Sequence, residues 1–173
     1  MEKFTLGTLT ISGGIGIYDS SYPINCMASE VAELEDYAKE LPAKNAITLF
    51  DASGRYGWQQ FTQQVLAEKY TAIADYMAVT QNRGKAFLYN ILKLLRDDGQ
   101  RFNRARFVYY LSRMEPDWRD ENISIREKDV YSVFSSKMYK WSTDAENRRQ
   151  VVSAIYLYVY MQREKEGENN NAH

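Results

Sequence analysis

The side chains with the clearest chemical potential are the arginines and lysines gathered between residues 81 and 114. This segment carries a net charge of +6, whereas residues 1–80 carry −5 and residues 115–173 carry −2, for a total of −1. Its eight cations are Arg83, Lys85, Lys93, Arg96, Arg101, Arg104, Arg106 and Arg113. Arginine and lysine neutralise phosphate groups, so we predict that these eight residues contact a nucleic-acid backbone.

Aromatic residues are interleaved with these cations: Phe87, Tyr89, Phe102, Tyr109 and Tyr110. Aromatic rings and guanidinium planes stack on bases, which strengthens the nucleic-acid interpretation. Internal pairing with the acidic N-terminal region would produce the same composition, and only the geometry of the patch separates the two explanations.

The chain has few of the residues that usually perform catalysis. His173 is the last residue, and Cys26 has no histidine to activate it, so neither a nucleophile–base pair nor a zinc ligand set can be assembled. Asp117, Asp120 and Glu121 are close in sequence but lack EF-hand spacing, and such acidic runs are typical of solvated surfaces. We therefore expect no catalytic residue, no metal and no cofactor, and predict that the chain is not an enzyme.

The glycine-rich run from Ser12 to Gly16 lacks both the GK[ST] ending of a P-loop and the full GxGxxG fingerprint. Two adjacent glycines, Gly13 and Gly14, suit the turn of a β-hairpin between residues 9–12 and 15–18. A second β-like run spans residues 46–50, followed by a predicted loop from Asp51 to Gly57.

Apolar periodicity predicts helices over most of the remaining chain. The expected ranges are about 27–41, 58–80, 85–97, 103–114, 125–141 and 144–166. We expect Ser29 to cap the first helix, and Ser124 and Thr143 to cap the last two through capping boxes. Residues 151–161 are apolar nearly all round, which favours a buried central helix, with a strand as the competing interpretation.

The predicted fold class is mainly α, a bundle of about six helices with a small N-terminal β-hairpin or strand element. Residues 1–166 are expected to form one domain, with a mixed strand and helix part over 1–57 and the helical bundle over 58–166. Residues 167–173 are expected to be a disordered tail. A lone cysteine, the polar start from Met1 to Leu6 and the shortness of the 151–161 run predict a cytoplasmic protein without a membrane span.

Two segments resemble the small helical subunit of type III CRISPR effector complexes. They run from Arg104 to Arg113, a basic helix with an aromatic and aliphatic core, and from Asn147 to Tyr160, rich in small and aromatic residues. The resemblance covers at most Arg83 to Glu166. It implies a non-catalytic antiviral-defence subunit that stacks beside a guide–target duplex, with Arg104, Arg106 and Arg113 as RNA-backbone contacts.

The first functional hypothesis is therefore a non-catalytic, RNA-associated scaffold subunit of a ribonucleoprotein complex. Its partners would be other protein subunits and RNA, with self-association through helical faces. The alternative is a protein-binding adaptor, inhibitor or immunity-type protein that makes no nucleic-acid contact and uses its acidic region and tyrosines. An enzyme would require a carboxylate cluster in a deep pocket, which the sequence does not indicate.

Overall fold

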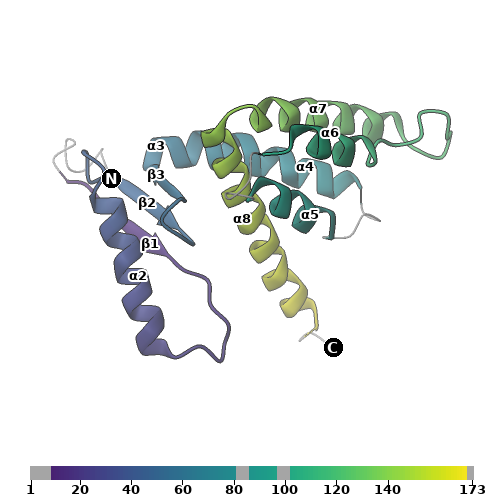
Figure 1. Ribbon diagram of the computed structural model, residues 1–173. Coiled ribbons are helices and arrows are strands. Elements are labelled where there is room, and N and C mark those ends of the chain that lie inside the picture. The colour runs from purple at the N-terminus through teal and green to yellow at the C-terminus, as the bar shows by residue number, and fades with distance from the viewer. Residues whose placement is uncertain (1–8, 81–85, 97–101, 171–173) are drawn as a thin grey trace. The chain divides into compact units, whose positions relative to one another are not determined.

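The computed structural model describes residues 9–80, 86–96 and 102–170, with side chains described as far as residue 162. Contacts divide the chain into two compact units, residues 1–64 and 65–173. The predicted fold class is confirmed, because helices dominate and the strands lie in the N-terminal unit (Figure 1). The expected single domain over 1–166 and the disordered tail over 167–173 stay predictions.

The N-terminal unit contains a three-stranded sheet and one long helix. Its elements are β1 (Gly13–Ile15), α2 (Ile24–Lys39), β2 (Ala46–Leu49), β3 (Arg55–Gly57) and α3 (Trp58–Gln60). The strand order is β1-β2-β3, with β1 parallel and β3 antiparallel to the central β2. Helix α2 connects the two parallel strands and packs on both of them, as Figure 1 shows.

The predicted hairpin at Gly13 and Gly14 is wrong. These glycines belong to β1 itself, and β1 pairs in parallel with β2 after the intervening α2. A Cβ atom on Gly14 would lie 2.7 Å from the backbone oxygen of Val31 and 2.7 Å from the backbone nitrogen of Glu35. Glycine is needed at position 14 because the α2 backbone approaches the strand closely, and this contact is distant in sequence.

Two further local predictions need correction in this unit. Helix α2 begins at Ile24 with Pro23 as its N-cap, three residues before the predicted start, so Ser29 lies within the helix instead of capping it. The predicted loop 51–57 contains β3, which pairs with β2. The expected strand at 46–50 is confirmed as β2, whose four residues are all buried.

The described residues of the helical unit form a π-helical segment and five α-helices. They are η1 (Phe61–Tyr70), which begins just before the unit, α4 (Thr71–Val79), α5 (Ala86–Leu95), α6 (Arg104–Ser112), α7 (Ile125–Ser142) and α8 (Ala145–Asn170). Helix α4 packs against α7 and α8, α5 packs against α8 and α6, and α6 packs against α7. The predicted helices agree with these elements, and the competing strand interpretation of 151–161 is excluded.

The core of this unit combines aromatic and aliphatic side chains. The stacked rings of Tyr76 and Phe134 lie 4.2 Å apart between centroids and join α4 to α7. From α8, the buried Val151, Ala154 and Ile155 supply small and branched side chains. A helix that is buried on most of its sides needs apolar residues all round, which accounts for the sequence of 151–161.

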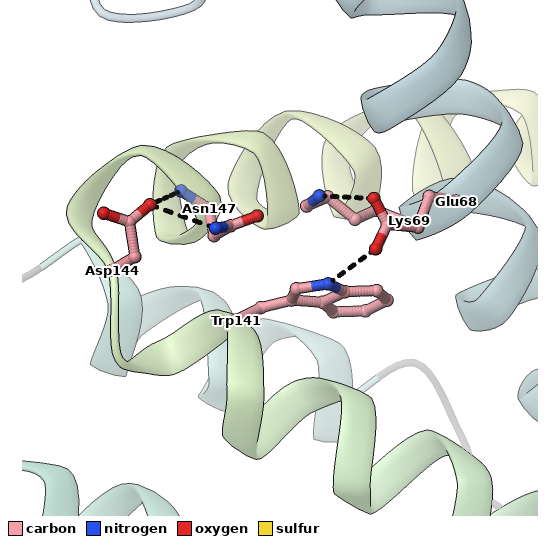
Figure 2. A network of polar contacts seen from close by, with 5 residues as sticks. All are labelled: Glu68, Lys69, Trp141, Asp144 and Asn147. Carbon is pink, nitrogen blue, oxygen red and sulfur yellow. Dashed lines mark hydrogen bonds and ion pairs between the residues drawn. The ribbon is translucent and has the colours of Figure 1, made fainter.

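The two capping residues predicted for the helical unit, Ser124 and Thr143, had different outcomes. Ser124 caps α7, because its Oγ accepts a hydrogen bond from the backbone N–H of Glu127 at 3.1 Å. Thr143 instead lies at the C-cap of α7, and the side chain of Asp144 accepts the backbone N–H of Asn147 at 2.8 Å (Figure 2). This bond from Asn147 lowers the pKa of the Asp144 carboxyl.

We predict that Gly14→Ala destabilises the N-terminal unit by about 2 kcal/mol, because the added Cβ meets backbone atoms of α2 that cannot move without shifting the helix. Gly13→Ala is the matched control, since a Cβ there meets nothing within 4 Å. Urea denaturation followed by circular dichroism measures both. Equal stability of the two variants would contradict the close approach of α2 to β1.

Candidate nucleic-acid interface and its supporting network

The predicted cations that the structure describes all lie on the surface of the helical unit. Lys93 and Arg96 are at the C-terminal end of α5, Arg104 and Arg106 are on α6, and Arg113 is the C-cap of α6. All five side chains are exposed. Arg83, Lys85 and Arg101 lie outside the described residues.

None of these five cations is paired with an acidic neighbour among the described side chains of the helical unit, which are those of residues 65–80, 86–96 and 102–162. The ion pair found there joins Lys69 to Glu68. Pairing of the basic segment with the acidic N-terminal region stays the alternative explanation. Contact with nucleic acid stays a prediction.

Helix geometry separates the α6 cations into two groups. The helix buries Phe107 and Leu111, and the side chain of Asn103 caps it by accepting the backbone N–H of Arg106 at 3.0 Å. Arg106 and Arg113 are seven residues apart and lie on one face, whereas Arg104 is two residues before Arg106 and points to a different side. The three arginines are all exposed, but they do not form a single row.

The α5 cations line an open hollow of about 510 Å³ together with Tyr89 and Leu92. The guanidinium of Arg96 lies over the ring of Tyr156 on α8, 5.5 Å from the ring centroid, and its Nη1 donates a hydrogen bond to the Tyr156 hydroxyl. Arg96 is therefore held in position by α8, which the sequence could not indicate because the two residues are 60 positions apart.

A second hollow, of about 440 Å³, lies between α6 and α7. Its lining includes the half-exposed rings of Trp118 and Tyr139, and also Glu115, whose carboxylate accepts the indole N–H of Trp118. Sequence reasoning missed this hollow. The carboxylate makes it less suited to a phosphate group than the α5 hollow, whose described lining residues include two cations and no acid.

A buried polar network supports the helices that carry these surfaces. The side chain of Lys69 in η1 is only 1% exposed, and its Nζ lies 3.1 Å from Glu68 Oε2 and 5.0 Å from the centroid of the Trp141 ring. The other Glu68 oxygen accepts the Trp141 indole N–H at 3.0 Å (Figure 2). The network joins η1 to the end of α7, and nothing in the sequence pattern marked Lys69 as buried.

Electrostatics in this network favour the ionised carboxylate. Partial burial raises the pKa of Glu68, but hydrogen bonds from Lys69 and Trp141 outweigh burial and leave the pKa below its usual value. No group of three or more metal-ligating side chains occurs in the described residues. Nor is any helix of the described part both long and apolar enough to cross a membrane.

The second helical domain of the CRISPR RNA silencing complex Cmr2 subunit matches residues 74–164, which is over half of the chain and corresponds to most of the helical unit. The chain therefore belongs to this family of type III CRISPR effector subunits, and the resemblance predicted from the sequence is confirmed at that level.

Three relatives share the name CRISPR system single-strand-specific deoxyribonuclease Cas10/Csm1, of subtype III-A. The protein of Mycobacterium tuberculosis is 40% identical over 96% of this chain and 20% of its own length. Those of Enterococcus italicus and Streptococcus thermophilus are 38% and 35% identical, over 94% and 91% of this chain and 19% and 20% of their own lengths. The chain spans about one fifth of these relatives, and the similarity includes the N-terminal unit.

These relatives correct two predictions. A non-catalytic scaffold or adaptor is contradicted, and so is the prediction that the chain is not an enzyme, because the relatives are named deoxyribonucleases. The scarcity of histidine and cysteine describes only these 173 residues. It has no bearing on the chemistry of proteins that are about five times as long as the matched region.

We predict that Glu68→Ala destabilises the helical unit by about 2 kcal/mol, because it leaves the Lys69 ammonium buried without a counter-charge. This is less than for a fully buried pair, since the Glu68 side chain is 45% exposed. Lys69→Met should cost less than about 1 kcal/mol, because Glu68 can turn to water. Chemical denaturation measures both variants, and a larger loss for Lys69→Met would contradict this account.

The network also predicts an acid dependence. A carboxyl whose pKa is lower in the folded chain contributes stability above the unfolded pKa of about 4.3, and this stability is lost as the pH falls through the folded pKa. Glu68→Gln should therefore be less sensitive to acid than the parent chain between about pH 5 and pH 3. The free energy of unfolding is measured against pH for both proteins. If the two curves run parallel, the folded chain does not lower the pKa of Glu68.

Proposed function

We propose that this chain works as part of a single-strand-specific deoxyribonuclease of a type III CRISPR system. The observation that carries the proposal is the similarity of 35–40% identity, over 91–96% of the chain, to three proteins of that name. The match to a helical domain of the Cmr2 subunit, which lies mostly in the helical unit, supports the CRISPR part of this assignment. Its protein partners would be the other subunits of that complex.

Within this protein, we propose that the helical unit contacts the backbone of single-stranded nucleic acid through its exposed cations. The supporting observation is that Lys93, Arg96, Arg104, Arg106 and Arg113 are all exposed and make no ion pair with the described side chains of the helical unit. Arg83, Lys85 and Arg101 belong to the same proposal on the basis of the sequence. An RNA strand offers the same phosphates, so RNA contact stays a prediction beside contact with DNA. Self-association, a role in antiviral defence and a cytoplasmic location also stay predictions.

We expect the protein that contains this chain, purified with its partner subunits, to cleave single-stranded DNA and to leave duplex DNA of the same sequence intact. Cleavage products are resolved on a denaturing gel, with heat-denatured protein as the blank. If neither substrate is cleaved, or both are cleaved equally, the assignment to a single-strand-specific deoxyribonuclease is wrong.

For the cations, the expected effect is on the salt dependence of binding. Replacing Lys93, Arg106 and Arg113 together with glutamine should reduce the slope of log K against log salt by roughly two, because each lost phosphate contact on a single strand contributes about 0.7. Fluorescence anisotropy with labelled single-stranded DNA, and with the same sequence as RNA, measures the slope.

A control variant removes the same charge from other helices. Arg126, Lys137 and Arg149 are also exposed, and their joint replacement with glutamine should leave the salt slope unchanged. Equal slopes for the two triple variants would show that binding follows net charge and not the α5 and α6 surface.

A further inference from the structure

The face of α5 places an aromatic ring beside two cations with helical spacing. Tyr89, Lys93 and Arg96 are separated by four and three residues, so their side chains lie on one side of the helix. Tyr89 is 43% exposed, and the two cations are exposed beyond it along the helix. The buried Leu92 also lines this hollow.

The hollow is electrostatically suited to an anion. Among the described residues, its lining holds two cations and no carboxylate, and a helix C-terminus contributes only about half a negative charge, which two full positive charges outweigh. The guanidinium of Arg96 is held over the Tyr156 ring, so less conformational freedom is lost when Arg96 meets a phosphate.

The volume and the ring point to a base as well as a phosphate. The hollow measures about 510 Å³, inside the range of about 300–1,000 Å³ that is usual for small-molecule sites. The ring of Tyr89 offers a half-exposed face, and every base can stack on such a face irrespective of its sequence. A base in a duplex is already stacked and paired, so it is not available to the ring.

We propose that the α5 hollow holds one unstacked nucleotide of a single strand, with its base against Tyr89 and its phosphates at Lys93 and Arg96. This inference rests on the proposed function and deepens it, because it gives the helical unit a physical means of preferring single strands. Tyr156 acts as a positioning residue, since it orients Arg96 without meeting the strand.

The test compares two oligonucleotides with the same charge. One is a single-stranded thymidine oligonucleotide, and the other has the same backbone with abasic positions. The full chain should bind the first about tenfold more tightly, because one stacked base is lost in the second. Tyr89→Ala should abolish this difference while leaving the salt slope unchanged, and Tyr89→Phe should retain it.

Trp118→Ala is the matched control, since Trp118 is a half-exposed ring in the hollow that contains Glu115, and it should bind like the parent chain. Equal affinity for the two oligonucleotides, or a loss with Trp118→Ala alone, would overturn the inference. If Tyr89→Ala blocks subunit assembly but leaves oligonucleotide affinity unchanged, the inference is also wrong. The hollow would then bind a protein subunit.

The two proposals can fail separately. If the abasic backbone binds as well as the thymidine strand and the cation triple variant still flattens the salt slope, the α5 hollow is not a base site but the backbone contact stands. If neither oligonucleotide binds at any salt concentration, both the backbone contact and the base site are wrong.

Discussion

The contact between Glu68 and Trp141 is the constraint on which the helical unit depends most. It joins a π-helical segment to a residue 73 positions later, at the end of α7, and it encloses the ammonium of Lys69. A buried lysine needs a partner, and Glu68 can serve both Lys69 and the indole because its two oxygens face different donors. The arrangement therefore fixes η1 against α7 more specifically than apolar packing alone would.

This anchoring extends to the helices that carry the cations. The hydroxyl of Tyr131 on α7 donates to the carbonyl of Leu111 on α6 at 2.8 Å, inside the core. The stacked rings of Tyr76 and Phe134 tie α4 to the same helix. With α7 as the common neighbour, α6 can bury Phe107 and Leu111 and leave its arginines at the surface. The cations of α6 are thus exposed because the core buries only the apolar residues of this helix.

The comparisons with known proteins cover the two units to different extents. The family match at 74–164 concerns the helical unit, while the longer alignments also include the β–α–β arrangement before it. In that arrangement Gly14 lets α2 lie directly on β1, and the four residues of β2 are buried. The chain corresponds to about one fifth of its relatives, which explains why its own side chains gave a misleading answer about catalysis.

The sequence alone predicted features that depend on neighbouring residues. The helical periodicity, the Ser124 cap, the strand at 46–50, the charge of the 81–114 segment and the type III CRISPR relationship are all properties of short stretches. The tertiary structure decided the features that depend on distant residues. The role of Gly14 is set by α2, the burial of Lys69 by α7, and the orientation of Arg96 by Tyr156 on α8. Local patterns specify which elements form, whereas close approach and burial arise only when elements far apart in the chain meet.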